Sequence, residues 1–491
     1  MLDKLRMFIL KFIKSNKEYP FIALLASGLY PVLYYFASNY SYANSFKHVL
    51  FFACLFIILP YVSLLILRRI FQYVLKQYSK YLIAIVNIFC FAAFMIVVTS
   101  GLNTLKLIAC LVGAIILGVL VYMHIKKLIV FQFFMAFVAL FWVAPKLYNE
   151  ITTSTDWMMQ ADAIEAVEFT KNPNVYIIQP DGYANFSELK RGHYGFNNKA
   201  FESILTENNF ILYNDFRSNY FSTITSNASM FAMKHHFYNN GKHQNIEPSN
   251  LRYIIAGNNP VVSIFKNNGY NTNLIIESEY LITNKPKLSY DYSNITIDEI
   301  SYLSKGFEIE RDVIADLERA MANNSDSSNF YFIEKILPGH VAQSRFDNLG
   351  KDKEREAYLD NLEKANTWLE KIVKTITNKD KNSLIVIVAD HGGFVGMNCI
   401  YEAKIKQSDP DLIKSVFTSA LAIKWPENEA FSGEFKTSVN LFRTLFSYLS
   451  DDTAYLKELE DEASYLVIKK EAPYGVYKAI DAKGEVVFEK H

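Results

Sequence analysis

Residues 383–393 read Ser-Leu-Ile-Val-Ile-Val-Ala-Asp-His-Gly-Gly. The unbroken apolar run Leu384–Ala389 predicts a strand that is buried on both faces of a parallel sheet. At the carboxyl end of this run the chain changes abruptly to Asp390, His391 and two glycines. Ligands of open α/β sheets bind at the carboxyl ends of the strands, and a carboxylate beside an imidazole suits a divalent metal. An ordinary turn after a core strand would contain the same residues, so the rest of the chain must decide.

A second stretch, residues 174–183, reads Asn-Val-Tyr-Ile-Ile-Gln-Pro-Asp-Gly-Tyr. It is another buried-strand run, and it ends in Asp181 followed by Gly182. An aspartate after a strand is often only a turn former or a helix cap. Two separate strands that both end in metal-type ligands, Asp181 in one and Asp390 in the other, nevertheless favour a shared metal site.

A third segment, residues 217–233, is rich in hydroxyl groups and small side chains and leads into a predicted helix. Thr223 would lie near the amino terminus of this helix, where free backbone N–H groups and the helix dipole favour an anion. The alternative is that Ser222 or Thr223 only caps the helix.

Strands and helices alternate through the rest of this region. Phe330–Leu337 is an apolar strand that leads into Pro338, Gly339 and His340, and Tyr358–Ile376 carries its apolar residues on one helical face. Further expected elements are strands at Asn273–Glu277 and Ala420–Trp425, a helix at Arg311–Asn323, and a β unit over Tyr465–Phe488 that turns at Asp481–Gly484. The alternation predicts a doubly wound α/β domain with a small C-terminal antiparallel β unit.

The apolar residues are unevenly distributed along the chain. They make up 51% of 491 residues, and the net charge is zero, which indicates neither nucleic-acid binding nor disorder. Up to about Pro145 there are five apolar stretches of membrane-spanning length, at about 19–38, 48–67, 82–100, 105–123 and 128–145. We therefore expect a five-span α-helical membrane domain at 1–145, an interfacial linker at 146–172 and an outward-facing domain at 173–491.

Lysine and arginine in the loops predict the orientation in the membrane. The N-terminal tail and the second and fourth loops carry eleven of these residues, whereas the first and third loops carry only Lys47 and Lys106. Because positively charged loops stay in the cytoplasm, we expect the tail to be cytoplasmic and the domain after the fifth span to be extracytoplasmic. Three of the four cysteines lie in the apolar part, so we expect neither a disulfide framework nor a cysteine-based zinc site.

At this point the chain resembles a known family. Over about residues 172–490 it is similar to the sulfatase-like branch of the alkaline phosphatase superfamily. Three motifs carry the resemblance: Tyr-Ile-Ile-Gln-Pro-Asp-Gly-Tyr (176–183), Ser-Asn-Tyr-Phe-Ser-Thr (218–223) and Ala-Asp-His-Gly-Gly (389–393). In architecture the chain looks most like lipoteichoic acid synthase and the lipid A phosphoethanolamine transferases, in which five membrane spans precede an extracytoplasmic catalytic domain.

The resemblance implies a role for each matching residue. Asp181, Thr223, Asp390 and His391 would be the ligands of one divalent metal, Zn²⁺ or Mn²⁺. Thr223 would also be the nucleophile, and His340 would contact the substrate phosphate.

Two positions depart from the family pattern, and the histidines bear on the number of metals. Asp181 stands where close relatives often have glutamate, and Lys335 stands where some have a histidine. Members with two metals need an additional aspartate and two further histidines. Of the nine histidines here, only His340 and His391 lie between His243 and the terminal residue, so we expect a single metal. The pair His235 and His236 is interpreted as surface histidines at a helix end, with a part in substrate binding as the alternative.

The resulting functional hypothesis is a bacterial cytoplasmic-membrane enzyme of the cell envelope. It would transfer a phosphoglycerol or phosphoethanolamine headgroup from a phospholipid donor to an envelope glycan or lipid, through a phosphothreonine at Thr223. The alternatives are an extracytoplasmic phosphodiesterase or phosphatase of the same fold, and a non-catalytic membrane scaffold. Sulfatase chemistry is disfavoured because no Cys-x-Pro-x-Arg type motif surrounds Thr223.

Overall fold

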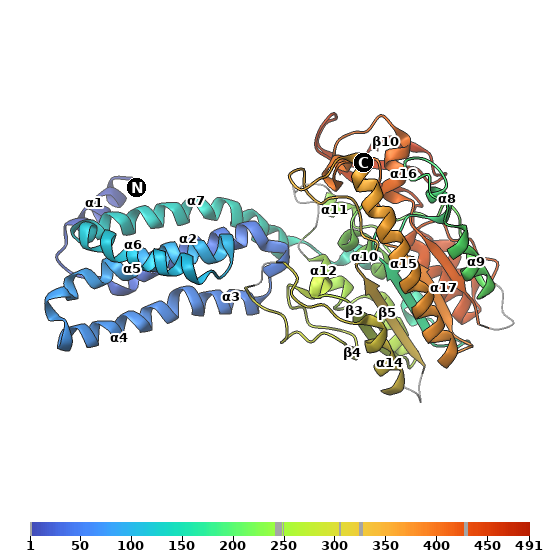
Figure 1. Cartoon of the computed structure of the whole chain (residues 1–491), viewed down its shortest axis with the longest axis horizontal. Coiled ribbons are helices and arrows are strands. Elements are labelled where there is room, and N and C mark those ends of the chain that lie inside the picture. Colours follow the sequence, from blue (N-terminus) through green and yellow to red (C-terminus); the bar gives the residue numbers. More distant parts are fainter. Residues whose placement is uncertain (1, 241–247, 249, 304–305, 324–327, 427–430) are drawn as a thin grey trace. The chain divides into compact units, whose positions relative to one another are not determined.

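The computed structural model describes the whole chain except residues 1, 241–247, 249, 304–305, 324–327 and 427–430. It consists of two compact units, and Figure 1 labels many of their helices and several of their strands. The first unit comprises Met1–Thr153 together with Thr283–Lys285 and Ile300–Glu308. The second unit comprises Ser154–Ile282, Pro286–Glu299 and Ile309–His491.

The first unit is built from long apolar helices. Its helices are α1 (Leu2–Lys14), α2 (Pro20–Ala43), α3 (Phe46–Ala53), α4 (Leu59–Val74), α5 (Leu82–Ser100), α6 (Thr104–Val121) and α7 (Ile125–Thr152), with short π or 3₁₀ segments η1 (Cys54–Ile58), η2 (Lys76–Tyr81) and η3 (Tyr122–His124). Many large apolar side chains on these helices are exposed, as expected of helices whose surroundings are lipid. Tyr302, from a later segment of this unit, stacks on Phe51 of α3 with ring centres 4.5 Å apart.

The number of candidate spans differs from the prediction. In the described part of the chain, four helical stretches are long and apolar enough to cross a membrane: Pro20–Ala43, Phe46–Val74, Lys76–Ser100 and Thr104–Thr152. The prediction has five separate spans, one more than this count. The expected fourth and fifth spans both fall within Thr104–Thr152, because η3 continues the helical backbone where the sequence suggested a loop.

The long stretch Thr104–Thr152 nevertheless packs as two segments. Its first part, α6, packs against α5, which it follows through a short turn after Gly101. Its second part, α7, packs against α2. Near the start of α7, Lys126 donates to the carbonyl of Ser15, and near its end Lys146 donates to the carbonyl of Ala37. Thus α7 runs alongside α2 in the same direction.

The second unit is organised around a seven-stranded sheet. Its strand order is β2-β7-β6-β1-β5-β3-β4. The strands are β1 (Val175–Pro180), β2 (Phe210–Leu212), β3 (Asn271–Ile276), β4 (Tyr292–Ser293), β5 (Asn329–Lys335), β6 (Leu384–Val388) and β7 (Leu421–Lys424). The central pairs β6–β1, β1–β5 and β5–β3 are parallel, whereas β7 pairs antiparallel with both β6 and β2. The predicted strands at 384–389 and 330–337 are therefore neighbours of the first strand, one on each side.

Helices cover both faces of this sheet. On one face, Tyr176 and Ile178 of β1 share an apolar cluster with Leu362 of α15. On the other face, Phe231 of α10 packs against Phe332 of β5, with ring centres 4.8 Å apart. The helices of this unit are α8 (Phe186–Leu189), α9 (Lys199–Glu207), α10 (Thr223–Ala232), α11 (Phe237–Asn240), α12 (Leu251–Ile255), α13 (Pro260–Asn267), α14 (Val313–Asn323), α15 (Lys351–Lys379), α16 (Pro410–Phe417) and α17 (Leu441–Ser450), with the 3₁₀ segments η4 (Asp156–Met158), η5 (Ile164–Ala166), η6 (Glu279–Ile282), η7 (Ile400–Lys404), η8 (Ser438–Asn440) and η9 (Thr453–Glu458). The predicted doubly wound α/β fold is confirmed.

A second, three-stranded antiparallel sheet closes the chain. It consists of β8 (Ser464–Ile468), β9 (Gly475–Ile480) and β10 (Val486–Lys490), in the order β10-β9-β8. The turn between the last two strands is closed by the N–H of Gly484, which donates to the carbonyl of Asp481 at 3.0 Å. The predicted C-terminal β unit and its turn are confirmed.

Candidate active site

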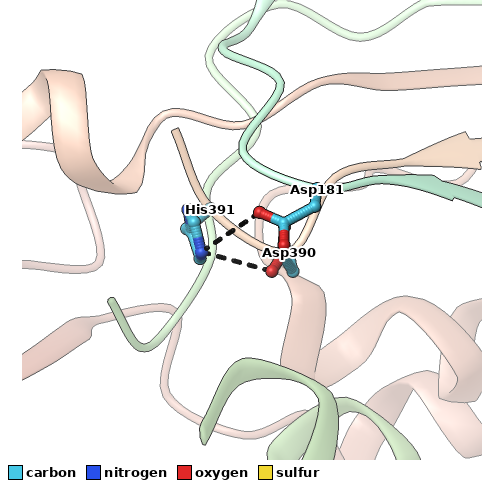
Figure 2. A group of neighbouring side chains, drawn as sticks. All are labelled: Asp181, Asp390 and His391. Carbon is cyan, nitrogen blue, oxygen red and sulfur yellow. Dashed lines mark ion pairs between the residues drawn. The ribbon is translucent and has the colours of Figure 1, made fainter. Parts of the chain in front are cut away.

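The predicted metal ligands lie at the carboxyl ends of two neighbouring strands. Because β1 and β6 are parallel and adjacent, Asp181 and the pair Asp390–His391 leave the sheet at the same edge. The Nε2 atom of His391 lies 3.3 Å from Oδ2 of Asp390 and 3.8 Å from Oδ1 of Asp181. Figure 2 shows the imidazole facing both carboxylates. All three side chains are buried.

Glycines allow the two strand ends to come this close. The N–H of Gly182 donates to Oδ1 of Asp390 at 3.0 Å, and Gly182 has a φ of +69°. A β-carbon on Gly182 would lie 2.1 Å from the carbonyl oxygen of Gly339, which no side chain could tolerate. A β-carbon on Gly393 would overlap the ring of Tyr358, whose hydroxyl donates to the carbonyl of Gly182 at 3.0 Å. The backbone geometry therefore fixes the carboxylates relative to each other.

The hydrogen bonding of His391 sets its tautomer. Its Nδ1 lies 2.8 Å from the carbonyl oxygen of Gly392, and a carbonyl can only accept a hydrogen bond. We therefore assign the proton to Nδ1, which leaves the Nε2 lone pair facing Asp181 and Asp390. This is the form of the imidazole that binds a metal.

Thr223 completes the group as the first residue of α10. Its Oγ1 lies 3.5 Å from Oδ2 of Asp181 and 3.4 Å from Nε2 of His391. Ser222 occupies the N-cap position, but its side chain makes no capping hydrogen bond. The rival hydroxyl of Thr225 instead donates to the carbonyl of Ser222 at 3.0 Å and is fully buried. The geometry thus selects Thr223 over Thr225 as the hydroxyl that faces the carboxylates.

These donor atoms fit a divalent metal. One ligand atom from each of Asp181, Asp390 and His391 lies within 4.8 Å of the others. Within the described part of the chain, Oδ1 of Asp181 and Oδ2 of Asp390 are buried without a hydrogen-bond partner. Burial, and then the charge of Asp390, raises the pKa of Asp181 to about 7, so the two carboxylates repel each other without a cation. Two carboxylates, an imidazole and a hydroxyl are the ligand set of Zn²⁺ or Mn²⁺.

His340 lies beside this group. Its ring centre is 5.9 Å from that of His391, and its Nδ1 lies 2.6 Å from the carbonyl oxygen of Val341. Burial, and then the neighbouring His391, lowers the pKa of His340. The ring nitrogen that faces away from this carbonyl is Nε2. Lys335, which stands where some relatives have a histidine, forms an ion pair with Glu277.

The expectation about His235 and His236 is wrong. His235 and His236 are buried, not at the surface, because the aromatic ring of Tyr220 covers them. Nε2 of His236 lies 3.0 Å from the carbonyl of Thr225, and burial lowers the pKa of His236 to about 3, so it stays neutral. His193 pairs with Asp409, and His243 lies outside the described residues.

Four polar residues near the site were missed by sequence reasoning. Gln179, Asn227 and Glu334 are fully buried, and burial, followed by the charges of Asp181 and Asp390, raises the pKa of Glu334 well above its ordinary value. A glutamate inside an otherwise apolar strand was the available signal for Glu334. The fourth residue, Lys404, lies with its Nζ 3.8 Å from the ring centre of Tyr401 and 6.0 Å from that of Phe221, two residues before Thr223. The sequence alone gives no sign that Gln179, Asn227 and Lys404 are buried, because such residues are also common at the surface.

Comparison with known proteins gives one family match. The model of the sulfatase family matches residues 174–451. No protein with curated function is similar enough in sequence to count as a match.

Several solved structures are similar at low identity. The lipooligosaccharide phosphoethanolamine transferase A (EptA) from Neisseria meningitidis has a TM-score of 0.41 and 12% identity, covering 81% of this chain and 81% of that one. The periplasmic domain of EptC from Escherichia coli in complex with Zn has a TM-score of 0.42 and 12% identity, covering 65% and 96%. The lipoteichoic acid synthase LtaP from Listeria monocytogenes has a TM-score of 0.40 and 12% identity, covering 66% and 90%. Similarity at this level does not extend to chemistry.

Proposed function

The chain belongs to the sulfatase family, and from this premise we propose that it is a membrane-anchored, metal-dependent phosphotransferase. It would move a phospho-headgroup of the phosphoglycerol or phosphoethanolamine type from a phospholipid to an envelope glycan or lipid. The observation that carries the proposal is the position of Thr223, whose Oγ1 lies at the start of a helix and within 3.5 Å of both Asp181 and His391.

The proposed reaction has two successive transfer steps at one metal site. Asp181, Asp390 and His391 would hold Zn²⁺ or Mn²⁺, which supplies positive charge that lowers the pKa of a hydroxyl and neutralises phosphoryl oxygens. Thr223 would attack the phosphorus of the donor, so that the lipid alcohol leaves and a phosphothreonine diester forms. The acceptor hydroxyl would then attack the same phosphorus and release Thr223. The amino terminus of α10 favours the anionic group throughout.

Two further side chains would meet the substrate. A bound phosphate would favour the doubly protonated ring of His340, whose Nε2–H would then donate to the phosphate or give its proton to the leaving oxygen. Lys404 would place a cation beside the anionic donor. Burial, and then the nearby charge of Lys469, lowers the pKa of Lys404 to about 7, and a bound anion would restore its charge.

A phosphate ester is favoured over a sulfate ester by the nucleophile itself. Sulfatases oxidise a cysteine or serine within a Cys-x-Pro-x-Arg type motif, whereas the residues before and after Thr223 are Phe-Ser and Ile-Thr. A threonine hydroxyl that stays a hydroxyl can form a stable phosphodiester and be released by a second alcohol. The four helical stretches that are long and apolar enough to cross a membrane, in the described part of the chain, support a donor that is itself a membrane lipid.

The proposed location of the catalytic unit is outside the cytoplasmic membrane. A reporter that is active only outside the cytoplasm should be active when fused after Glu150 and inactive when fused after Arg69. Activity after Arg69 and none after Glu150 would place the catalytic unit in the cytoplasm, away from envelope acceptors.

The covalent step can be tested directly. The full-length protein, incubated with a phospholipid labelled in its headgroup and then digested, should carry the label on Thr223, located by fragmenting the labelled peptide in a mass spectrometer. Label on Thr225 would contradict the assignment. Release of the labelled headgroup to water alone, in the presence of envelope lipids and glycans, would indicate a phosphodiesterase, and no label or turnover with bound metal would indicate a scaffold.

A further inference from the structure

A second group of polar residues lies directly below the candidate active site, between α10 and the sheet. Two contacts fix how α10 packs there. At its start, Oγ1 of Thr223 lies 3.5 Å from Asp181, and two turns later the ring of Phe231 packs on Phe332. Asn227 is four residues from each of Thr223 and Phe231, so all three lie on the same face of the helix. Asn227 therefore faces the sheet midway between these two contacts.

The sheet presents two polar side chains at the same level. Gln179 of β1 and Glu334 of β5 are direct register partners in adjacent parallel strands, so they lie on one face. Glu334 comes two residues after Phe332, and Gln179 comes two residues before Asp181. One helical turn rises about 5.4 Å and two strand residues about 6.6 Å, so each successive turn of α10 lies opposite the next strand residue on the same face. This spacing puts Asn227 of the helix at the level of Gln179 and Glu334 in the strands, one turn below Thr223.

None of these three side chains is satisfied by the protein. All three are fully buried. Both polar atoms of each side chain lack a hydrogen-bond partner among the described residues. Since roughly 90% or more of buried polar groups in proteins have a partner, six orphaned atoms at one point indicate a ligand that is not part of the chain.

The charge and the donor types indicate what this ligand is. A buried glutamate needs a compensating cation or a proton. The next residue, Lys335, does not provide it, because adjacent strand residues point to opposite faces and Lys335 pairs with Glu277. Four of the six atoms are oxygens, from one carboxylate and two amides, and the two amide nitrogens, which can only donate hydrogen bonds, would not bind the ion. Oxygen ligands without nitrogen or sulfur suit Mg²⁺, Ca²⁺ or Na⁺ rather than Zn²⁺.

We propose that Gln179, Asn227 and Glu334 form a second cation site for a hard, oxygen-preferring ion, one helical turn below Thr223. Such an ion would tie α10 to β1 and β5 and so hold Thr223 in place over Asp181. It would also offset the charge of Glu334 beneath Asp181 and Asp390. The site does not depend on the proposed transferase activity, because it rests on burial and packing alone.

Metal content of the full-length protein tests the proposal. The protein in detergent is equilibrated with Zn²⁺ together with Mg²⁺ or Ca²⁺, freed of unbound ions and analysed for both elements, and melting curves are recorded with NaCl against choline chloride to detect Na⁺. His391→Ala should lose Zn²⁺ and keep the hard cation. Glu334→Gln should keep Zn²⁺ and bind the hard cation at least tenfold more weakly. Glu277→Gln removes a nearby carboxylate that already has a lysine partner, and as a control it should keep both ions.

Other outcomes would overturn the site. If Glu334→Gln matches the unmodified protein in ion content and in its response to every salt, Glu334 carries a proton and the three side chains surround water. If Glu334→Gln does not fold, the His391→Ala protein decides the question. A hard cation bound to it supports the site, and its absence from both the unmodified and the His391→Ala proteins refutes it.

Discussion

Two levels of one helix–sheet interface differ in what they can do. The upper level, at the ends of the strands, consists of Asp181, Thr223, Asp390 and His391, and the lower level, inside the strands, consists of Gln179, Asn227 and Glu334. Both place carboxylates opposite the same face of α10. The lower level is closed beneath by the packed rings of Phe231 and Phe332. Of the two groups, only the upper level combines a hydroxyl group with a histidine, so we expect the reaction to take place there and the lower level to hold Thr223 in position.

The largest expected effect separates Thr223 from Asn227 on the same helix. Thr223→Ala should lower kcat by several orders of magnitude because no other group can take over covalent transfer. Its free energy of unfolding should change by only about 1 kcal/mol, since one small side chain is lost. Asn227→Ala should retain measurable turnover. The assay is headgroup release from labelled phospholipid, with melting curves for each variant and Thr225→Ala as a neighbouring control. If Thr223→Ala and Asn227→Ala lower kcat equally, the two levels do not differ in their part in the reaction.

The second effect concerns the metal ion that we expect the upper level to bind. The full-length protein should bind about one Zn²⁺ or Mn²⁺ per chain, and Asp390→Asn or His391→Ala should weaken this binding by about 100-fold or more, since each removes a direct ligand. His193→Ala is the matched control, because His193 only pairs with Asp409. Two tightly bound transition metals per chain would contradict the single-metal prediction and favour a phosphatase.

The two levels also differ in how far the sequence predicts them. Asp181, Asp390 and His391 each follow an apolar run, so the rule that ligands collect at strand ends was enough to group them. Gln179 and Glu334 lie within their strands, and they meet only because β1 and β5 are adjacent and in that register. Strand order and register depend on contacts between distant segments, which no local pattern contains.

The same limit explains the other differences between sequence and structure. Hydropathy located the apolar segments, but the helical continuity through η3 depends on local backbone geometry that a hydropathy pattern does not carry. The burial of His235 and His236 comes from packing against Tyr220, which the sequence places well before them. Composition therefore predicted which segments are apolar, and tertiary packing decided which polar residues are buried.

The third prediction concerns how the stability of the metal-free protein depends on pH. Its basis is the pKa of Asp181, which is about 7 in the fold against an ordinary 3.8. A raised carboxyl pKa means that the unfolded chain releases its proton first, so the stabilising contribution is complete below about pH 4 and is lost as the pH rises through 7. The metal-free protein should thus become less stable between pH 5 and 8, by an amount on the order of a few kcal/mol at most.

Melting curves of the protein freed of metal with a chelator measure how its stability depends on pH. They should be recorded with Mg²⁺ and Ca²⁺ absent and then present, so that any contribution of Glu334 is separated. Asp181→Asn should flatten the dependence, and added Zn²⁺ should stabilise the protein more at pH 8 than at pH 5.5, because protons compete with the metal for Asp181. A metal-free protein that gains stability between pH 5 and 8 would contradict the raised pKa.

The smallest expected effect lies just outside both levels, at Lys404. Its Nζ lies 6.0 Å from the ring centre of Phe221, two residues before Thr223, and we propose that it contacts an anionic donor held there. Because its pKa is lowered to about 7, its charge is lost as the pH rises through that value when no anion is bound. The KM for an anionic phospholipid should therefore rise about threefold to tenfold between pH 6.5 and 8.5, the equivalent of about 1 kcal/mol, while kcat changes little.

Three variants test this role of Lys404. Lys404→Arg keeps its charge at every pH and should make KM nearly independent of pH. Lys404→Gln should show the high KM throughout, and Lys406→Gln serves as a control at a neighbouring cation. If Lys404→Gln lowers kcat and leaves KM unchanged, Lys404 takes part in the reaction itself. It would then belong with the residues of the upper level rather than with a separate binding contact.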